Sequence, residues 1–552
     1  MSQPQYKSRR AEESVMAKNL ADFMIKETGI EVTPNLQAVI ASAYEAVLRG
    51  KTCHRHVGTP PEGKLFGPAA TAGDTGDEGY LNTPFSVLKL TKAEDDGTTS
   101  LVYLRSMDDA EHLFVQSLTA INQPRAEPWK VDLNASFLKP ENLSEDKHAA
   151  LLALGHRRFL IITGGPGTGK TRTIQAMLKV AQIAGSVPKS QIAVLAPTHR
   201  ARIRIQEGLD GSKQDLLADI KAQTVHAFIR DSRKGVQAEF VVVDEASMVD
   251  LVTFRQLLES LRPSASLIVV GDPDQLPSVD VGSVLADLCN AEVLRNPNLG
   301  ILHRFQYQHR FASDSSIARL AASILSVDVT AVEEVARDNR NKNGLQELTP
   351  EAIVKYVLAG ERNPYTEVVR LARAAALSKV VNPRDLIRQA MDNFNQLRLL
   401  CSHRVGPLGS LALSRLIMEQ LKVESPQDDG AIIMVTRNDL DLGITNGEIG
   451  IVSGDHAYFQ SGEDLKAFGL AQLPEYLPAF ATTIHASQGS QFGKVIVVLG
   501  KTNKDDFISR QMVYTAVTRA EREVVLLAED GAVSTALKTP IGRASGLQYR
   551  LV

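Results

Sequence analysis

The stretch that most constrains this chain runs from residue 159 to residue 173 and reads FLIITGGPGTGKTRT. Its first five residues are apolar or β-branched, which is typical of a buried parallel strand. The next eight fit the phosphate-binding pattern G-x-x-x-x-G-K-[ST], from Gly164 to Thr171. Apolar residues at helical spacing follow over residues 173–184. Strand, glycine-rich loop and helix rarely occur in this order by chance, so the stretch predicts a nucleoside triphosphate site.

Each part of this loop has a chemical task. The glycines let the backbone turn its N–H groups toward phosphate oxygens, and the helix start adds a positive dipole end. Lys170 supplies a charge for the β- and γ-phosphates, and the Thr171 hydroxyl is placed to ligate Mg²⁺. We therefore expect the nucleotide to be held by Gly164, Gly165, Pro166, Gly167, Thr168, Gly169, Lys170, Thr171 and Arg172.

Composition narrows the class of protein. At ~100–200 residues per domain, a chain of 552 residues suggests roughly three to five domains. The hydrophobic share of 43% is that of a globular protein, and no apolar run approaches the ~18 residues of a membrane span. The polar N-terminus lacks the apolar centre of a signal peptide, and three scattered cysteines are too few for a disulfide framework. We expect a cytoplasmic protein, whose net charge of -3 neither indicates nor excludes nucleic-acid binding.

Residues 1–125 predict a separate N-terminal unit of mixed α+β structure. The stretch 58–83 is rich in Gly, Pro, Thr and Asp and predicts a loop. Short strands are expected at 85–90 and 100–104, and a helix at 109–121. No catalytic constellation occurs here, so we expect a scaffold or docking domain.

Residues 126–296 contain further short apolar strands at 192–196, 240–243 and 267–270, each followed by polar residues. In an open parallel α/β sheet, ligands bind at this carboxyl edge. Asp244 ends a strand and is expected to hold Mg²⁺. Glu245 can polarise the water that attacks the γ-phosphate, and Gln275 can sense that phosphate.

The remainder of the chain predicts three further parts. Residues 297–430 are more irregular, and their polar stretch 339–343 predicts a loop. Residues 431–478 predict short strands, with a hairpin turn at Asn446-Gly447. Residues 479–552 return to an α/β pattern with strands at 495–499 and 524–528.

Several segments, in this order, resemble one known family: GGPGTGKT, LAPTHRAR, TVHAF, VVVDEASMVDL, VVGDPDQLPSV, QYQHRF, TTIHASQGSQF and VYTAVTRA. They are similar to the RecD branch of the superfamily 1 helicases that move 5′ to 3′, over roughly residues 145–530. The N-terminal unit resembles the partner-docking domain of exodeoxyribonuclease V alpha subunits. The resemblance implies an α/β fold with two RecA-like P-loop domains, at 126–296 and at 297–430 with 479–552, around a small β-barrel-like insertion at 431–478.

The resemblance also implies an activity and its residues. ATP and Mg²⁺ would lie between the two domains, where Lys170, Asp244, Glu245 and Gln275 are joined by Gly489, Arg310 and Arg519. A DNA strand would cross both domains in contact with Thr198, His199, Thr224, His226, Thr483, His485 and Ser487. Expected partners are DNA and RecB-like and RecC-like subunits in a heterotrimer, with a role in double-strand break repair and recombination.

The chain departs from the family at one place. Family members usually carry a Gln just before the first strand, which reads adenine, and this chain has Asp146-Lys147-His148 there. The resemblance therefore does not extend to that contact with the base.

Other functions stay open on the sequence alone. A stand-alone RecD-like helicase usually carries an extra N-terminal helix-hairpin-helix region, which is not apparent here. A P-loop phosphotransferase or nucleotide switch would need neither Gln488-Gly489 nor Arg519. A structural subunit with a silent motor would not need Lys170 and Asp244. No Asp/Glu/Lys nuclease cluster is apparent, so nuclease activity is expected from a partner.

Overall fold

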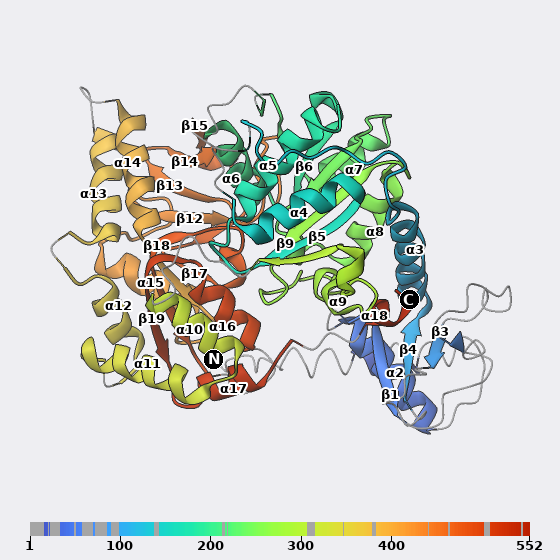
Figure 1. Ribbon diagram of the computed structural model, residues 1–552. Helices are drawn as coiled ribbons and strands as arrows, with labels where there is room; N and C mark the ends of the chain where they lie inside the picture. Colours follow the sequence, from blue (N-terminus) through green and yellow to red (C-terminus); the bar gives the residue numbers. More distant parts are fainter. Residues whose placement is uncertain are drawn as a thin grey trace.

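The computed structural model describes residues 16–19, 21–22, 34–48, 51–57, 70–71, 85–89, 99–136, 138, 143–211, 216–217, 219–305, 315–345, 347–360, 362–377, 382–439, 441–461, 464–501, 508–541 and 545–551. Two parallel sheets form the centre of the molecule, as the α/β fold class predicts (Figure 1).

The first parallel sheet carries the phosphate loop. Its order is β10-β5-β9-β8-β6-β7, and every neighbouring pair is parallel. Four of these strands were predicted, and they form because short β-branched runs are buried on both faces of the sheet. The strands are β5 (Phe159–Gly164), β6 (Ile192–Ala196), β7 (Ala222–Thr224), β8 (Phe240–Val243), β9 (Ser266–Gly271) and β10 (Leu302–Phe305).

The second parallel sheet has the order β17-β11-β18-β19. Its central strand β18 is apolar and buried along most of its length, because helices cover both faces of the sheet. The strands are β11 (Leu397–Cys401), β17 (Ala481–Thr483), β18 (Phe492–Leu499) and β19 (Ala520–Ala528).

A third sheet lies in the predicted insertion, and its described strands are antiparallel in the order β15-β14-β13-β12-β16. The order ends in two edge strands, so the described strands do not close into the expected barrel-like unit. Their apolar side chains share one core with helices α12 to α15, so this sheet is not an independent body. The strands are β12 (Ile432–Val435), β13 (Ile449–Ser453), β14 (His456–Ser461), β15 (Asp464–Gly469) and β16 (Tyr476–Pro478).

The N-terminal unit has a small sheet of order β1-β4-β3-β2, with β1 (Cys53–Val57), β2 (Ala70–Thr71), β3 (Phe85–Lys89) and β4 (Thr99–Leu104). The helix α3 (Arg105–Ile121) continues directly from β4 but packs on the first parallel sheet. The Phe114 ring lies 5.6 Å from the Phe254 ring, edge to face. The last helix of the unit predicted at 1–125 is therefore part of the hydrophobic core of the first parallel sheet.

Two further boundaries also differ from the prediction. The strand β10 was assigned to the second RecA-like domain, but it pairs with β5 in the first sheet. Residues 545–551 were assigned to the same domain, but they return to α3, where the Gly546 N–H donates to Glu111 Oε1 at 3.1 Å. Arg550 Nε donates to Glu111 Oε2 at 3.2 Å. Figure 1 shows α18 (Leu547–Arg550) and the C-terminal end of the chain beside α3. Apolar surface left on the first domain explains both departures, since Leu302 and Leu547 join its core.

Residues 339–342 of the polar stretch expected to be a loop are helical. They form the last turn of α11 (Val329–Lys342), which is anchored by buried Val332 and Ala336 while its other faces meet solvent. Within the described parts of the chain, no helix has the length and apolar character needed to cross a membrane. The other helices are α2 (Pro34–Leu48), α4 (Glu145–His156), α5 (Lys170–Ile183), α6 (His199–Gly211), α7 (Val225–Ser232), α8 (Leu251–Ser260), α9 (Val284–Asn290), α10 (Ser316–Leu325), α12 (Pro350–Val357), α13 (Pro364–Leu377), α14 (Pro383–Gln396), α15 (Ser410–Gln420), α16 (Arg510–Val517), α17 (Ala532–Lys538) and α18 (Leu547–Arg550).

Candidate active site

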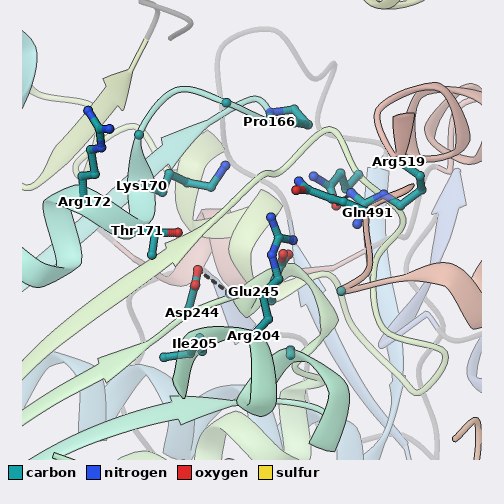
Figure 2. Close-up of a pocket in the computed structure, with 15 residues that line it drawn as sticks. Pro166, Lys170, Thr171, Arg172, Arg204, Ile205, Asp244, Glu245, Gln491 and Arg519 are labelled. Atoms are coloured by element: carbon teal, nitrogen blue, oxygen red, sulfur yellow. Dashed lines mark hydrogen bonds between the residues drawn. The ribbon is translucent and has the colours of Figure 1, made fainter. Parts of the chain in front are cut away.

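A cavity of about 390 Å³ lies at the carboxyl edge of the first sheet. The loop before α5 forms one wall and the ends of β8 and β9 form the floor (Figure 2). From the second part of the chain, Gly489, Gln491 and Arg519 close the cavity. Its lining includes most residues predicted to hold the nucleotide: Pro166, Gly167, Gly169, Lys170, Thr171, Arg172, Asp244, Glu245, Gln275, Gly489 and Arg519.

The phosphate loop adopts the backbone that its glycines permit. Gly167 and Gly169 have φ values of 79° and 86°, in the left-handed region that side chains disfavour. Lys170 then begins α5, so the first N–H groups of that helix lie at the loop. Lys170 Nζ donates to the carbonyl oxygens of Gly164 at 2.5 Å and Gly165 at 3.0 Å. This ammonium group is therefore held over the loop, where a phosphate would lie.

Two carboxylates follow β8. Asp244 is 8% exposed, and its Oδ1 accepts a 2.8 Å hydrogen bond from the Glu245 backbone N–H. Burial, together with the neighbouring Glu245 charge, raises the pKa of Asp244 to about 6. Carboxylate and hydroxyl oxygens are ligands that Mg²⁺ prefers, and Thr171 lines the same cavity. The donor set of Thr171 and Asp244 therefore fits a magnesium ion, which would favour the charged form of Asp244.

Arg519 reaches the first domain from the opposite side of the cavity. It is 1% exposed, and its Nη2 donates to Gln275 Oε1 at 2.8 Å. The same guanidinium donates to the carbonyl oxygens of Ser490 at 3.2 Å and Thr515 at 3.1 Å. Gln275 Nε2 in turn donates to Asp272 Oδ2 at 3.1 Å. Two predicted catalytic residues, 244 positions apart in the chain, thus share one hydrogen bond across the cleft.

Further hydrogen bonds join the same two walls. The Leu276 N–H donates to Thr515 Oγ1 at 2.8 Å, and Gln488 Nε2 donates to the Leu276 carbonyl at 2.9 Å. Tyr514 donates to Asp272 Oδ2 at 3.1 Å, and burial raises the pKa of its hydroxyl well above the usual value. The loop after β9 is therefore bonded directly to α16, and motion of either element changes the geometry at Gln275.

The predicted DNA contacts lie at strand ends, but four of their hydroxyls make local hydrogen bonds. Thr198, Thr224 and Thr483 accept from backbone N–H groups three residues onward, and Ser487 donates to the Ile484 carbonyl. The hydroxyls of Thr198 and Thr224 thereby stabilise the starts of α6 and α7.

The histidines of that set differ from one another. His199 Nδ1 lies 3.1 Å from Glu448 Oε1 of the third sheet region. Burial would raise the pKa of Glu448, but hydrogen bonds from His199 and Thr445 hold it below its usual value. His226 is exposed on α7, and His485 is half-buried after β17. Arg310, the other arginine expected at the γ-phosphate, lies outside the described residues.

Some cavity residues were missed by the sequence analysis: Ala201, Arg204 and Ile205 of α6, and Gln491. For the three residues of α6 the signal is helical spacing, because positions 201, 204, 205 and 208 share one face of that helix. A Cβ atom at Gly208 would lie only 3.3 Å from Thr171 Cγ2, so this face lies against the start of α5.

Known proteins resemble both walls of this cavity. A family model described as an AAA domain matches residues 147–281, and one described as a UvrD-like helicase C-terminal domain matches residues 478–527. The first range includes Lys170 and Asp244, and the second includes Gly489 and Arg519.

Similarities over most of this chain are also present. The RecBCD enzyme subunit RecD of Mycobacterium tuberculosis is 33% identical over 482 residues, covering 82% of this chain and 80% of that protein. The ATP-dependent RecD2 DNA helicase of Deinococcus radiodurans is 27% identical over 384 residues, covering 69% of this chain and 48% of that protein. A solved Pif1 helicase from Bacteroides, in complex with ADP-AlF3 and ssDNA, matches with a TM-score of 0.38 and 16% identity, over 77% of this chain and 95% of that one.

Proposed function

This chain belongs to the family of the RecBCD enzyme subunit RecD, and from that premise we propose that it is the ATP-driven DNA helicase of a RecBCD-type complex. It is an ATP-hydrolysing enzyme that acts on DNA, in double-strand break repair and recombination. The observation that carries this proposal is the hydrogen bond between Arg519 and Gln275, because it completes a phosphate-binding cavity from two separate sheets.

The cavity residues have complementary roles in ATP hydrolysis. Lys170 holds the β- and γ-phosphates, and Arg519 stabilises the charge that develops on the γ-phosphate. Mg²⁺ bound by Thr171 and Asp244 would neutralise phosphate charge. Glu245 lines the cavity beside Asp244 and orients the attacking water by accepting its proton.

Hydrolysis is coupled to movement through the bonds that cross the cleft. The Gln275–Arg519 and Leu276–Thr515 hydrogen bonds join the loop after β9 to α16. Loss of the γ-phosphate removes a charge at this junction, so the two sheets change their separation in each cycle. A DNA strand held at the carboxyl ends of both sheets would then advance, by contacts at Thr198, His199, Thr224, His226, Thr483, His485 and Ser487.

The N-terminal unit is proposed as the surface that binds RecB-like and RecC-like subunits. The name of the Mycobacterium tuberculosis relative supports that assembly, and we place the complex in the cytoplasm. The Deinococcus radiodurans relative supports a second candidate, a stand-alone helicase, but this chain spans only 48% of that protein. The assembly with two partners is therefore the preferred proposal.

The test uses duplexes with a single-stranded tail at one end, with any partner helicase inactivated. We expect ATP-dependent unwinding from a 5′ tail and none from a 3′ tail, since the chain belongs to the RecD branch. The Lys170→Ala variant provides the inactive control, because it lacks the charge on the phosphate loop. Unwinding from a 3′ tail alone would overturn the proposed direction.

A further inference from the structure

A basic side chain outside the predicted set points into the ATP cavity. Arg204 lies on the face of α6 that also carries Ala201 and Ile205, and all three line the cavity. Figure 2 shows its side chain rising past Glu245 toward the space beside Lys170 and Arg519. Gly208, one turn later on α6, lies against Thr171, so this part of the helix is close to the phosphate loop.

Arg204, like Arg172 at the other end of the cavity, differs in its bonding from Lys170 and Arg519. Lys170 donates to loop carbonyls, and Arg519 donates to three protein oxygens. Among the residues that the structure describes, the Arg204 guanidinium has no hydrogen bond or ion pair. A guanidinium has five N–H donors in a planar fork, which fits the oxygens of a phosphate. The bonding partner of Arg204 is therefore expected to be a ligand with negative charge.

Its electrostatic neighbours locate Arg204 at one end of the cavity. Burial raises the pKa of Asp244, and the positive charge of Arg204 partly offsets this increase. Burial lowers the pKa of Arg519, and the positive charge of Arg204 lowers it further. Arg204 therefore acts electrostatically on both residues. Asp244 and Arg519 are the residues assigned to the metal and to the terminal phosphate. Arg172 lies apart, on the far side of Lys170 in Figure 2. Of the cavity arginines on the first domain, Arg204 is thus the one beside the reacting end.

We propose that Arg204 is a catalytic residue that donates to the terminal phosphate of ATP from the first domain, opposite Arg519. This inference rests on the proposed ATPase function of the same cavity. It gives α6 a second task, since Arg200, one turn earlier, donates to the carbonyl oxygens of Ala486 and Gly447 across the cleft at 2.9 Å each. One helix would then contact both the γ-phosphate and the segment that carries His485 and Ser487.

The experiment separates contact with the terminal phosphate from a general effect on nucleotide binding. The affinities for a fluorescent ADP and for a non-hydrolysable ATP analogue are measured for the unchanged full chain and for its Arg204→Ala and Arg204→Gln variants. We expect unchanged ADP affinity and about 10-fold weaker analogue binding, because only the analogue has the third phosphate. DNA-stimulated kcat should fall about 10²–10³-fold, as for removal of one donor to a transition-state oxyanion.

Arg262→Ala is the matched control, since Arg262 is exposed before β9, at the opposite edge of the same sheet. Its affinities and kcat should equal those of the unchanged chain. An unchanged ratio of analogue affinity to ADP affinity in Arg204→Gln would overturn the proposal, whether both affinities fall equally or neither falls. Absence of DNA-stimulated ATPase in the unchanged chain would instead refute the proposed function, while the analogue-to-ADP ratio would still test Arg204.

Discussion

Replacing Arg519 by alanine tests the active site most directly. The change removes three hydrogen bonds, but the Thr515 carbonyl keeps a second donor, the Thr518 hydroxyl at 3.1 Å. The Ser490 carbonyl and Gln275 Oε1 lose the donors that the described structure gives them. Gln275 Oε1 is buried, whereas the Ser490 carbonyl is half-buried. At about 1–3 kcal/mol for a buried acceptor without a partner, stability falls by roughly 1–3 kcal/mol.

The expected catalytic loss is of a similar or larger size. An arginine that stabilises phosphoryl transfer contributes about 10³–10⁵ in rate, or roughly 4–7 kcal/mol of transition-state stabilisation. ADP binding should change little, because Lys170 and the phosphate loop remain intact. Hydrolysis and unwinding should therefore fall together while ADP is still bound.

The assay measures DNA-stimulated ATP hydrolysis, ADP affinity and unwinding from a 5′ tail at a temperature where the variant is folded. Arg522→Ala is the control, because Arg522 is exposed three residues later and bonds to Gln396 outside the cavity. A double variant with Gln275→Ala should lose less than the product of the two single losses, since both changes remove one shared hydrogen bond. Wild-type hydrolysis by Arg519→Ala would refute the assigned role.

Three more outcomes are expected. Lys170→Ala should abolish DNA-stimulated hydrolysis and leave the melting temperature within a few degrees; hydrolysis at the original rate would mean that the phosphate loop is wrongly assigned. Deletion of residues 1–104 should release the chain from its partner subunits in size-exclusion chromatography. Deletion through residue 125 should also destabilise the motor, by more than the about 3–5 kcal/mol of a single Phe→Ala change, because it removes fully buried Phe114 and the rest of α3. Arg550→Ala should cost about 3–5 kcal/mol in denaturant titration, because it leaves the Glu111 carboxylate, 0% exposed, without its cation; an unchanged midpoint would show that the C-terminal contact is not formed.

Much of the nucleotide site was predictable because its signals are local. The spacing of Gly164, Lys170 and Thr171 determines a loop between a strand and a helix, and that order was confirmed. Asp244 and Gln275 were predictable for a related reason. Each follows a short apolar run, and parallel strands in one sheet bring their carboxyl ends to one edge.

The boundaries between structural units were not predictable from the same patterns. The strand β10 and the amphipathic helix α3 were assigned to the nearest unit along the chain, but the apolar side chains of each pack on the first domain, where they cover apolar surface. The polar stretch 339–343 was assigned to a loop because its own residues are hydrophilic. Its residues 339–342 are helical because Val332 and Ala336, earlier in α11, anchor the helix on the second domain.

The family resemblance led us to expect two walls around the cavity, but only the tertiary structure determines the contacts between them. Nothing in the local sequence of Arg519 indicates that its guanidinium bonds to Gln275, because the contact depends on how two sheets face each other. Arg204 was missed for the same reason: an arginine in a helix usually faces solvent, and only the packing of Gly208 against Thr171 turns this face of α6 toward the phosphate loop. Local patterns determine strands, loops and helix starts, whereas contacts between residues distant in the chain depend on the burial of surfaces that a linear pattern does not pair.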